Sequence, residues 1–358
     1  MQRALVLARR GRGRTAPNPI VGAVVVRNGE CVGEGFHARA GEAHAEVVAL
    51  REAGARARGA TLYVTLEPCC HAGRTPPCAP AVVEAGVRRV VSAMEDPDPR
   101  VRGAGHRELR EGGLEVAVGV EEATARRDNA EFVHRVSTGR AFGVLKAAIT
   151  LDGRLAADGG DSRWITGPEA RERAHELRDR YDAVLIGRGT LSSDDPRLDV
   201  RLAGERRNPR AVVVDSRLRT GADRALYQRA KEGAQVLVAT TDQAPDERVL
   251  ELRALGVDVR VLPADEGGVS LPALFRELAA TGSNSVLIEG GEAVLTSALR
   301  HGLVQRVHVF VAPKILGGSG GPRLVGDLGI DRVERAVQLD DVEWEAMGGD
   351  LFLTGSVR

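Results

Sequence analysis

The chain has 358 residues, enough for two domains with cores of their own, and its 43% of hydrophobic residues argues against disorder. Its formal net charge is zero and only 3% of its residues are aromatic. A protein that binds polynucleotides is usually basic, and its single-strand channels are rich in stacking aromatics, so we expect a small-molecule substrate rather than nucleic acid.

No segment predicts export or membrane insertion. The apolar run near the N-terminus is too short for a signal peptide, and no later run approaches the ~20 residues of a membrane span. Of the four cysteines, three (Cys69, Cys70 and Cys78) fall within ten positions, which suits a metal site better than a disulfide framework. We therefore expect a cytoplasmic protein with no membrane partner.

The first part of the chain alternates strand and helix patterns. Residues 20–26 form an apolar, β-branched run that ends at Asn28-Gly29, a dipeptide typical of hairpin turns. Cys31, in the strand expected at 31–35, is predicted to lie in the core. The elements expected next are a helix at 46–57, a strand at 61–66, a helix at 80–85, a strand at 87–93 and a helix at 121–127. This order favours a sheet with helices packed on it.

A break in the pattern at residues 137–142 divides the chain into expected domains of residues 1–140 and 141–358. In the second domain, strands are expected at 144–149, 183–187, 211–215, 235–240, 257–262, 285–289 and 307–312, mostly separated by helices. Repeated βα units predict a largely parallel sheet with helices on both faces. The fold class is therefore α/β.

His44, Cys69 and Cys78 predict a hydrolytic zinc site. One imidazole and two thiolates hold zinc while a fourth position stays open for water, whose pKa the metal lowers to about 7. The expected fold brings His44, at a helix start, close to Cys69, at a strand end. Glu46 would carry protons between water and substrate and protonate the departing amino group. We therefore expect one zinc ion per chain and the removal of an exocyclic amino group from a nitrogen heterocycle.

Several features around this site leave alternatives open. His44-Ala45-Glu46 taken alone is more typical of a surface histidine beside an acidic helix start. Cys70 and His71 are rival ligands, although Cys70 is expected to point away from the metal. Nucleoside deaminases have two residues between their cysteines, whereas eight separate Cys69 from Cys78 here. The insert at residues 71–78 carries Arg74 and two prolines, which would anchor a polar part of the substrate or simply stiffen the loop.

The second domain carries weaker signals. A strand ending in Gly290-Gly291 and opening a helix lets backbone N–H groups approach a phosphate, whereas the glycine turn at 187–190 is more typical of a tight connection. No full G-x-G-x-x-G occurs there, which argues against a Rossmann fold. Asp194-Asp195-Pro196 places two carboxylates at a loop, where they would cap a helix or, alternatively, serve the chemistry.

Motifs along nearly the whole chain resemble the bifunctional deaminase/reductase family of riboflavin biosynthesis. The motifs that carry the resemblance are Pro17-Asn18-Pro19-Ile20-Val21-Gly22, residues 37–45, residues 65–78, Leu145-Lys146, Thr150-Leu151-Asp152-Gly153, Ser162-Arg163-Trp164-Ile165-Thr166, residues 187–190, Asp194-Asp195-Pro196, residues 198–201, Glu289-Gly290-Gly291 and Ala312-Pro313-Lys314. The eight-residue cysteine spacing is the one that this family shows. One departure is Cys70, where the family usually has serine in Pro-Cys-Ser-His.

The resemblance implies a cytidine-deaminase-like zinc domain followed by a dihydrofolate-reductase-like domain. It implies hydrolytic deamination of 2,5-diamino-6-ribosylamino-4(3H)-pyrimidinone 5′-phosphate, and then reduction of the ribosyl group to ribityl by NADPH. The preference for NADPH over NADH and homo-oligomerisation through the reductase sheet are also implied by similarity alone.

The resemblance also assigns roles to individual residues. The catalytic residues would be Glu46 and Asp194, and the zinc ligands His44, Cys69 and Cys78. Cofactor contacts would come from Ala148, Trp164, Thr190, Asp194, Ser216 and Gly291, and substrate contacts from Ser162, Arg178, Leu198, Arg201 and Glu289. Two rival functions remain, namely a deaminase of tRNA or free nucleosides and a non-catalytic regulator that binds a nucleotide. A binding module would have no need of Glu46.

Overall fold

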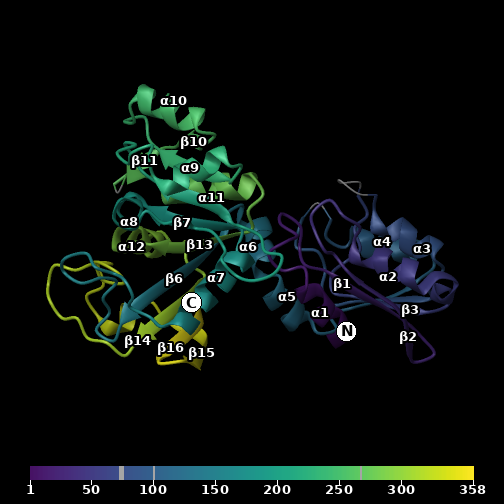
Figure 1. Ribbon diagram of the computed structural model, residues 1–358. Coiled ribbons are helices and arrows are strands. Elements are labelled where there is room, and N and C mark those ends of the chain that lie inside the picture. Colours follow the sequence, from purple (N-terminus) through teal and green to yellow (C-terminus); the bar gives the residue numbers. More distant parts are fainter. Residues whose placement is uncertain (72–75, 100, 267) are drawn as a thin grey trace. The chain divides into compact units, whose positions relative to one another are not determined.

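The computed structural model describes residues 1–71, 76–99, 101–266 and 268–358, which form two compact units, Met1–Gly139 and Arg140–Arg358 (Figure 1). Residues 72–75, and with them the expected anchor Arg74, lie outside the described residues. Within the described ranges, no helix is long and apolar enough to cross a membrane.

The first unit is built on a five-stranded sheet in the order β2-β1-β3-β4-β5. Its strands are β1 (Gly22–Arg27), β2 (Glu30–Phe36), β3 (Thr61–Val64), β4 (Arg89–Ser92) and β5 (Glu115–Val118). The hairpin β1–β2 and the pair β1–β3 are antiparallel, whereas β3, β4 and β5 run parallel. The carboxyl ends of these parallel strands therefore meet at one edge of the sheet, where connecting loops commonly build a binding site.

Helices complete the first unit. They are α1 (Gln2–Arg9), α2 (Ala45–Ala53) with the 3₁₀ turn η1 (Gly54–Ala57), α3 (Cys78–Glu84), α4 (Ala104–Glu111), α5 (Glu122–Asp128) and α6 (Ala130–Thr138). One apolar core joins the sheet to α2, α3 and α4, and includes Leu50, Leu62, Val82, Val90 and Leu109. These side chains are 9% exposed or less, so this unit has the core of an independent domain.

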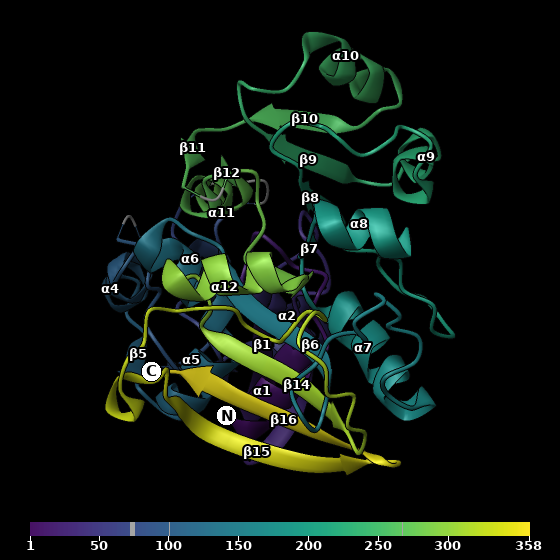
Figure 2. The same cartoon turned by 90° about the vertical axis from the view of Figure 1, so that its left-hand side faces the viewer.

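The second unit contains a nine-stranded sheet in the order β10-β9-β8-β7-β13-β6-β14-β16-β15, with neighbouring strands parallel from β10 to β14 (Figure 2). The last two strands pair antiparallel. The strands are β6 (Phe142–Thr150), β7 (Ala183–Gly187), β8 (Arg210–Val214), β9 (Val236–Thr240), β10 (Asp258–Val261), β13 (Ser285–Gly290), β14 (Arg306–Ala312), β15 (Leu339–Met347) and β16 (Asp350–Val357). A separate short hairpin joins β11 (Ala264–Asp265) to β12 (Gly268–Val269).

Helices cover both faces of this sheet, with α7, α8 and α9 on one side and α11 and α12 on the other (Figure 2). The helices are α7 (Pro168–Arg180), α8 (Arg188–Asp194), α9 (Ala225–Lys231), α10 (Asp246–Ala254), α11 (Leu271–Ala280) and α12 (Glu292–Arg300), with a 3₁₀ turn η2 (Val333–Arg335). Leu274 and Phe275 of α11 and Leu295 of α12 share one buried cluster with the sheet. The predicted, largely parallel sheet is confirmed, with an antiparallel hairpin added at one end.

Most of the expected strands and helices are present with shifted ends, but two expectations were wrong. Cys31 is exposed rather than buried, because it is the second residue of an edge strand that starts beside the Asn28-Gly29 turn. The glycine turn expected at 187–190 is instead the N-cap and first turn of α8. The sequence patterns did not predict α1, α4, β5, α6, β11, β12, β15 and β16.

Candidate functional site

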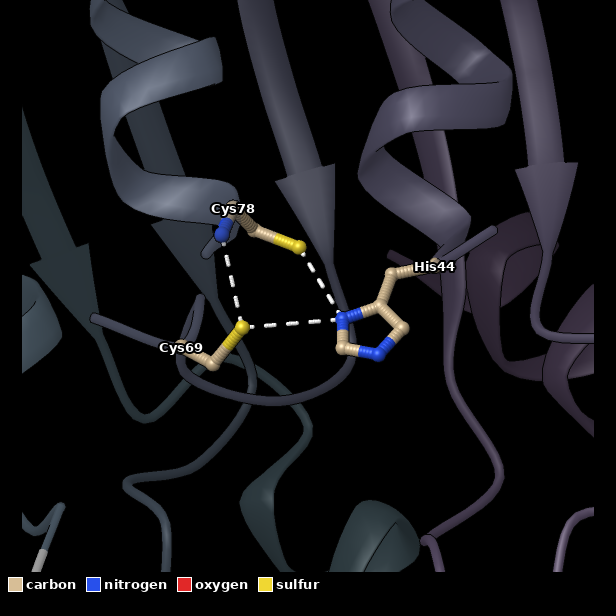
Figure 3. Close-up of side chains that lie close together, drawn as sticks. All are labelled: His44, Cys69 and Cys78. Carbon is tan, nitrogen blue, oxygen red and sulfur yellow. Dashed lines mark hydrogen bonds between the residues drawn. The ribbon is translucent and has the colours of Figure 1, made fainter. Parts of the chain in front are cut away.

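Three ligand-type side chains of the first unit converge at the edge where its parallel strands end. His44 is the N-cap of α2, Cys69 lies in the loop after β3, and Cys78 is the first residue of α3. The Nδ1 atom of His44 lies 3.1 Å from the Sγ of Cys78 and 3.5 Å from the Sγ of Cys69 (Figure 3). Among the described residues, these three form the group that could hold a metal ion.

The geometry of this group fits zinc. Zn–S bonds of about 2.3 Å and Zn–N bonds of about 2.0–2.1 Å, arranged tetrahedrally, place nitrogen and sulfur ligands roughly 3.5 Å apart. The two measured distances are 3.1 and 3.5 Å. The Cys78 thiol, with the backbone N–H of Cys78 and His44 as further donors, lowers the pKa of Cys69 to about 4, while the same hydrogen bond raises the pKa of Cys78, so the pair holds one thiolate and one thiol. Cys70, the rival ligand, lies outside the group.

Glu46 lies two residues after the candidate metal ligand His44. It occupies the first turn of α2 and is only 3% exposed. Burial raises the pKa of Glu46 to about 7, although the neighbouring His44 and Cys78 act in the opposite direction. A carboxyl group whose pKa lies near neutrality can both take and return a proton, which is the property expected of a general acid and base.

A buried carboxylate, Glu67, fixes the loop that carries Cys69, and sequence reasoning missed this role. Its oxygens accept hydrogen bonds from the backbone N–H groups of Asp96, Gly103 and His106, at 3.0, 3.0 and 3.1 Å. Helix α4 approaches closely, because a Cβ atom on Gly105 would lie 1.9 Å from the carbonyl oxygen of Pro68. The metal ligand Cys69 is therefore positioned by a segment about 30 residues further along the chain.

A second histidine borders the metal group. The ring of His37 is 2% exposed and packs edge-on against the ring of His44, with 5.2 Å between their centroids. Its Nε2 lies 3.1 Å from the side-chain nitrogen of Asn18, and its Nδ1 lies 3.2 Å from the carbonyl oxygen of Ala43. Asn18 belongs to a motif that the sequence analysis singled out, but only the fold shows that it faces this histidine.

In the second unit, two of the residues expected to bind substrate, Arg178 and Glu289, belong to a buried charge cluster. Arg178 of α7 donates two hydrogen bonds to Glu289 of β13, from Nε at 2.7 Å and from a terminal nitrogen at 2.8 Å. The Nζ of Lys146, on the neighbouring strand β6, lies 3.7 Å from Glu289. The side chains of Arg178 and Glu289 are 14% and 7% exposed. Burial would raise the pKa of Glu289, but the two cations outweigh it and lower that pKa to about 2.

The Arg178 guanidinium is thus committed to Glu289 in this structure, and Arg201 lies apart from it. Arg178 also donates to the backbone oxygen of Asp199 at 3.3 Å, and the Arg201 Nε lies 3.9 Å from the Asp199 carboxylate. Arg201 is exposed, with a terminal nitrogen 3.4 Å from the ring of His175. Both arginines therefore contact Asp199, but only Arg201 is exposed.

The expected cofactor residues Thr190 and Gly291 lie side by side. Cβ atoms added to Gly290 and Gly291 would come within 2.9 and 3.3 Å of the Thr190 hydroxyl oxygen. Gly291 is the N-cap of α12, so the backbone N–H groups of that helix start beside Thr190. A pocket of about 500 Å³ borders the same end of α12, lined by Glu292, Ser319, Gly320, Gly321, Arg323, Val325, Gly326 and Asp327.

The two carboxylates of the Asp194-Asp195 pair have different environments. Asp194 is the last residue of α8, partly exposed, and its backbone oxygen accepts a hydrogen bond from Arg163 at 2.9 Å. Asp195 accepts the backbone N–H of Ala225, at the start of α9, at 2.9 Å. Asp195 therefore has the helix-capping role, and Asp194 is the one whose carboxylate could face a ligand.

The remaining expected contacts are spread along the second unit. Trp164 is 63% exposed, with the Arg171 guanidinium 4.6 Å from its ring. The Ser216 hydroxyl accepts the backbone N–H of Val269 at 3.1 Å. Leu198 is only 2% exposed. The other two positions, Ala148 on β6 and Ser162 in the loop before α7, are partly exposed.

Both units match known families. Residues 1–94 match the cytidine and deoxycytidylate deaminase zinc-binding region, and residues 141–353 match the RibD C-terminal domain. The chain is 41% identical, over 353 residues, to the riboflavin biosynthesis protein RibD of Actinobacillus pleuropneumoniae, covering 99% of this chain and 93% of that protein. It is 40% identical to the Escherichia coli RibD protein over 365 residues, covering 99% and 97%.

Solved structures agree along the full length. A RibD structure from Acinetobacter baumannii superposes with a TM-score of 0.90 at 36% identity, covering 100% of this chain and 97% of that one. A diaminohydroxyphosphoribosylaminopyrimidine deaminase/5-amino-6-(5-phosphoribosylamino)uracil reductase from Thermotoga maritima gives 0.85 at 36% identity, with the same coverage. The predicted fold class, a cytidine-deaminase-like unit followed by a dihydrofolate-reductase-like unit, is confirmed. The chain belongs to the RibD family of riboflavin biosynthesis proteins.

Proposed function

We propose that residues 1–140 deaminate 2,5-diamino-6-ribosylamino-4(3H)-pyrimidinone 5′-phosphate and that residues 141–358 then reduce its ribosyl group to ribityl. Membership of the RibD family makes the chain a bifunctional deaminase and reductase that uses zinc and NADPH. The observation that carries the proposal is the convergence of His44, Cys69 and Cys78 beside the buried carboxyl group of Glu46. This combination supplies both a metal site and a proton carrier.

In the deaminase unit, His44, Cys69 and Cys78 would hold the zinc ion. When bound, zinc supplies a Lewis acid that makes water nucleophilic near neutral pH. Glu46 would accept a proton from that water and deliver one to the departing amino group, so that ammonia leaves. Its burial supports this assignment, because a carboxyl group with a pKa of about 7 is competent in both directions. Glu67 and α4 would keep Cys69 in place during the reaction.

In the reductase unit, the chain's residues would orient the two reactants. NADPH, when bound, supplies the hydride. Thr190 and Gly291 would contact the cofactor at the start of α12, together with Ala148, Trp164 and Ser216. Arg178 and Arg201 would contact the phosphate of the substrate, and Ser162, Leu198 and Glu289 would contact other parts of it. Asp194 would guide the proton that accompanies hydride transfer, since the neighbouring Asp195 carboxylate is already used to accept the backbone N–H of Ala225.

We also propose that the chain works in the cytoplasm as a homo-oligomer that associates through the sheet of the second unit. The exposed terminal strand β15 supports this, because it presents Val342 and Trp344, which are 40% and 59% exposed. An unpaired strand edge with apolar side chains is a natural place for a second chain to bind.

The test uses two substitutions in the full chain. Glu46→Gln should abolish ammonia release while zinc stays bound, and Asp194→Asn should slow NADPH oxidation while deamination continues. Glu84→Gln, an exposed carboxyl group on α3, is the matched control and should leave both activities unchanged. Deamination retained by Glu46→Gln would remove Glu46 from the mechanism. If Asp194→Asn depressed both activities together, the assignment of the two reactions to separate sites would be wrong.

A further inference from the structure

Two loops leave neighbouring strands of the second unit and lie against each other. The first, which we term the β6 loop, comprises residues 151–166 and follows β6. The second comprises residues 313–327 and follows β14, and its part at residues 316–321 is termed here the glycine segment. Because β6 and β14 are parallel neighbours, both loops emerge at the same edge of the sheet (Figure 2).

Backbone hydrogen bonds join the two loops. The N–H of Leu151 donates to the oxygen of Lys314 at 2.8 Å, and the N–H of Leu155 donates to the oxygen of Pro322 at 2.9 Å. In the opposite direction, the N–H of Leu324 donates to the oxygen of Gly153 at 3.1 Å. The loops therefore form a single paired structure rather than two independent connections.

Side chains of the β6 loop bind the backbone of the glycine segment. Arg154, only 6% exposed, donates to the carbonyl oxygen of Gly321 at 2.7 Å and also to that of Gly318. The Asp158 carboxylate accepts the N–H groups of Gly320 and Gly321, at 3.2 and 2.6 Å. Thus the Arg154 guanidinium binds carbonyl oxygens of the glycine segment, and the Asp158 carboxylate binds its backbone N–H groups.

Asp152 repeats this pattern at the near end of the glycine segment. Its carboxylate accepts the N–H groups of Leu316 and Gly317, at 3.2 and 2.7 Å. The segment also needs glycine where it meets Asp158. Gly318 has a φ of +75°, and a Cβ atom there would lie 2.5 Å from both carboxylate oxygens of Asp158. The sequence of the segment is therefore matched to this carboxylate.

These contacts matter because each loop contributes to the same functional region. The β6 loop carries Ser162 and Trp164, and the Nζ of Lys314 donates to the carbonyl oxygen of Trp164 at 2.7 Å. The glycine segment supplies Ser319, Gly320 and Gly321 to the pocket of about 500 Å³ at the start of α12. A change in the pairing of the loops would displace both Trp164 and the pocket wall.

We propose that Asp158 and Arg154 are positioning residues for cofactor binding. By joining the β6 loop to the glycine segment, a connection we term the latch, they fix the position of Trp164 relative to the pocket wall. The inference rests on the proposed reductase function. Neither residue needs to touch the cofactor, because each acts through the backbone of the glycine segment. The latch lowers the entropic cost of binding, since both loops are ordered before the cofactor arrives.

The contacts of Asp158 distinguish a role in cofactor binding from a role in stability alone. Asp158 is an exposed residue, and its partners are backbone groups of a surface loop. Its loss should therefore change the stability of the unit little, while the loops become free to separate. A latch is expected to alter the affinity for NADPH, whereas a structural residue would alter unfolding and all activities of the unit together.

The experiment compares Asp158→Ala with Asp161→Ala in the full chain. Asp161 is an exposed carboxylate of the same loop, which accepts the N–H of Arg163 at 3.1 Å within that loop, so it is the matched control. For Asp158→Ala, we expect the KM and the calorimetric Kd for NADPH to rise about tenfold, because without the two charge-assisted hydrogen bonds the loops must be ordered when the cofactor binds. The kcat should change less than twofold, and ammonia release should not change. Asp158→Asn should recover part of the affinity.

A second measurement needs no turnover. In a Trp344→Phe background, Trp164 is the one remaining tryptophan of the chain. Asp158→Ala should lower its fluorescence anisotropy relative to Asp161→Ala, since the β6 loop moves more freely. Unchanged KM, Kd and anisotropy would overturn the proposal, as would equal losses of kcat and affinity accompanied by a lower unfolding temperature. If the unsubstituted chain fails to oxidise NADPH but still binds it, the reductase function fails, whereas the latch is supported or overturned by Kd and anisotropy alone.

Discussion

Glu289→Gln is the substitution with the largest expected effect on the second unit. The carboxylate is buried between Arg178 and Lys146, and its pKa falls from an ordinary value of 4.5 to about 2. At about 1.4 kcal/mol for each pH unit, this difference corresponds to about 3 kcal/mol of folding free energy at pH 7. The amide keeps the shape of the side chain but leaves two buried cations without their counter-ion, which is strongly destabilising.

The sign of the pH dependence follows from the direction of this shift. A carboxyl group with a lowered pKa in the folded state contributes stability above its unfolded pKa of 4.5, and that contribution disappears as the pH falls through about 2. The difference in unfolding free energy between the unsubstituted chain and Glu289→Gln should therefore be about 3 kcal/mol at pH 7 and only about 1 kcal/mol at pH 3.

Urea unfolding followed by tryptophan fluorescence measures this difference in unfolding free energy for the second unit of the chain. The chain has two tryptophans, Trp164 and Trp344, and both belong to the second unit. Glu172→Gln, an exposed carboxyl group on α7, is the control and should change the unfolding free energy by less than about 0.5 kcal/mol. If Glu289→Gln unfolds at the same urea concentration as this control at pH 7, the buried charge cluster does not stabilise the unit and the reasoning is refuted.

Three further predictions concern the two sites. Gly105→Ala should lower zinc content and ammonia release at least tenfold without affecting reduction, because its Cβ atom would lie 1.9 Å from the Pro68 oxygen and displace Cys69; normal zinc content would contradict this. Gly290→Ala should raise the KM for NADPH several-fold, since its Cβ atom would lie 2.9 Å from the Thr190 hydroxyl; steady-state kinetics with unchanged KM would count against a cofactor site there. A zinc chelator should stop ammonia release yet spare reduction of the deaminated pyrimidine, and loss of both activities would argue for a shared site.

The zinc group could be predicted from sequence because its residues lie in short motifs at element ends. His44 precedes an amphipathic helix, and Cys69 follows a short apolar strand, so their proximity followed from the order of elements. The hydrogen bonds that hold the loop of Cys69 in place could not be predicted. Glu67 binds backbone groups at residues 96–106, and no side-chain pattern indicates a partner that is an amide group.

In the second unit, too, local motifs could be predicted from the sequence, whereas contacts that depend on strand pairing could not. Glu289-Gly290-Gly291 indicated a strand that ends beside a helix start, and the structure has that arrangement. Lys146, by contrast, stands within the apolar run of β6, and only the parallel pairing of β6 with β13 brings it near Glu289. The strand β15 was not predicted although charged and apolar residues alternate along it, and the structure leaves most of it exposed.

The exposed position of Cys31 has a related cause. A strand pattern predicts alternation of side chains between two faces, but it does not show which strand lies at the edge of the sheet. Strand β2 is an edge strand, and Cys31 lies at its exposed beginning. Edge positions depend on the pairing of all the strands, which is a property of the whole unit.

The most direct test of the two-site account is a coupled assay with the purified chain, the diaminopyrimidinone ribosyl phosphate and NADPH. Ammonia and NADPH would be followed together, with and without a zinc chelator. The account predicts that ammonia appears first, that NADPH is consumed only after deamination, and that the chelator abolishes ammonia release. NADPH consumption that precedes ammonia release, or ammonia release that survives removal of zinc, would contradict it.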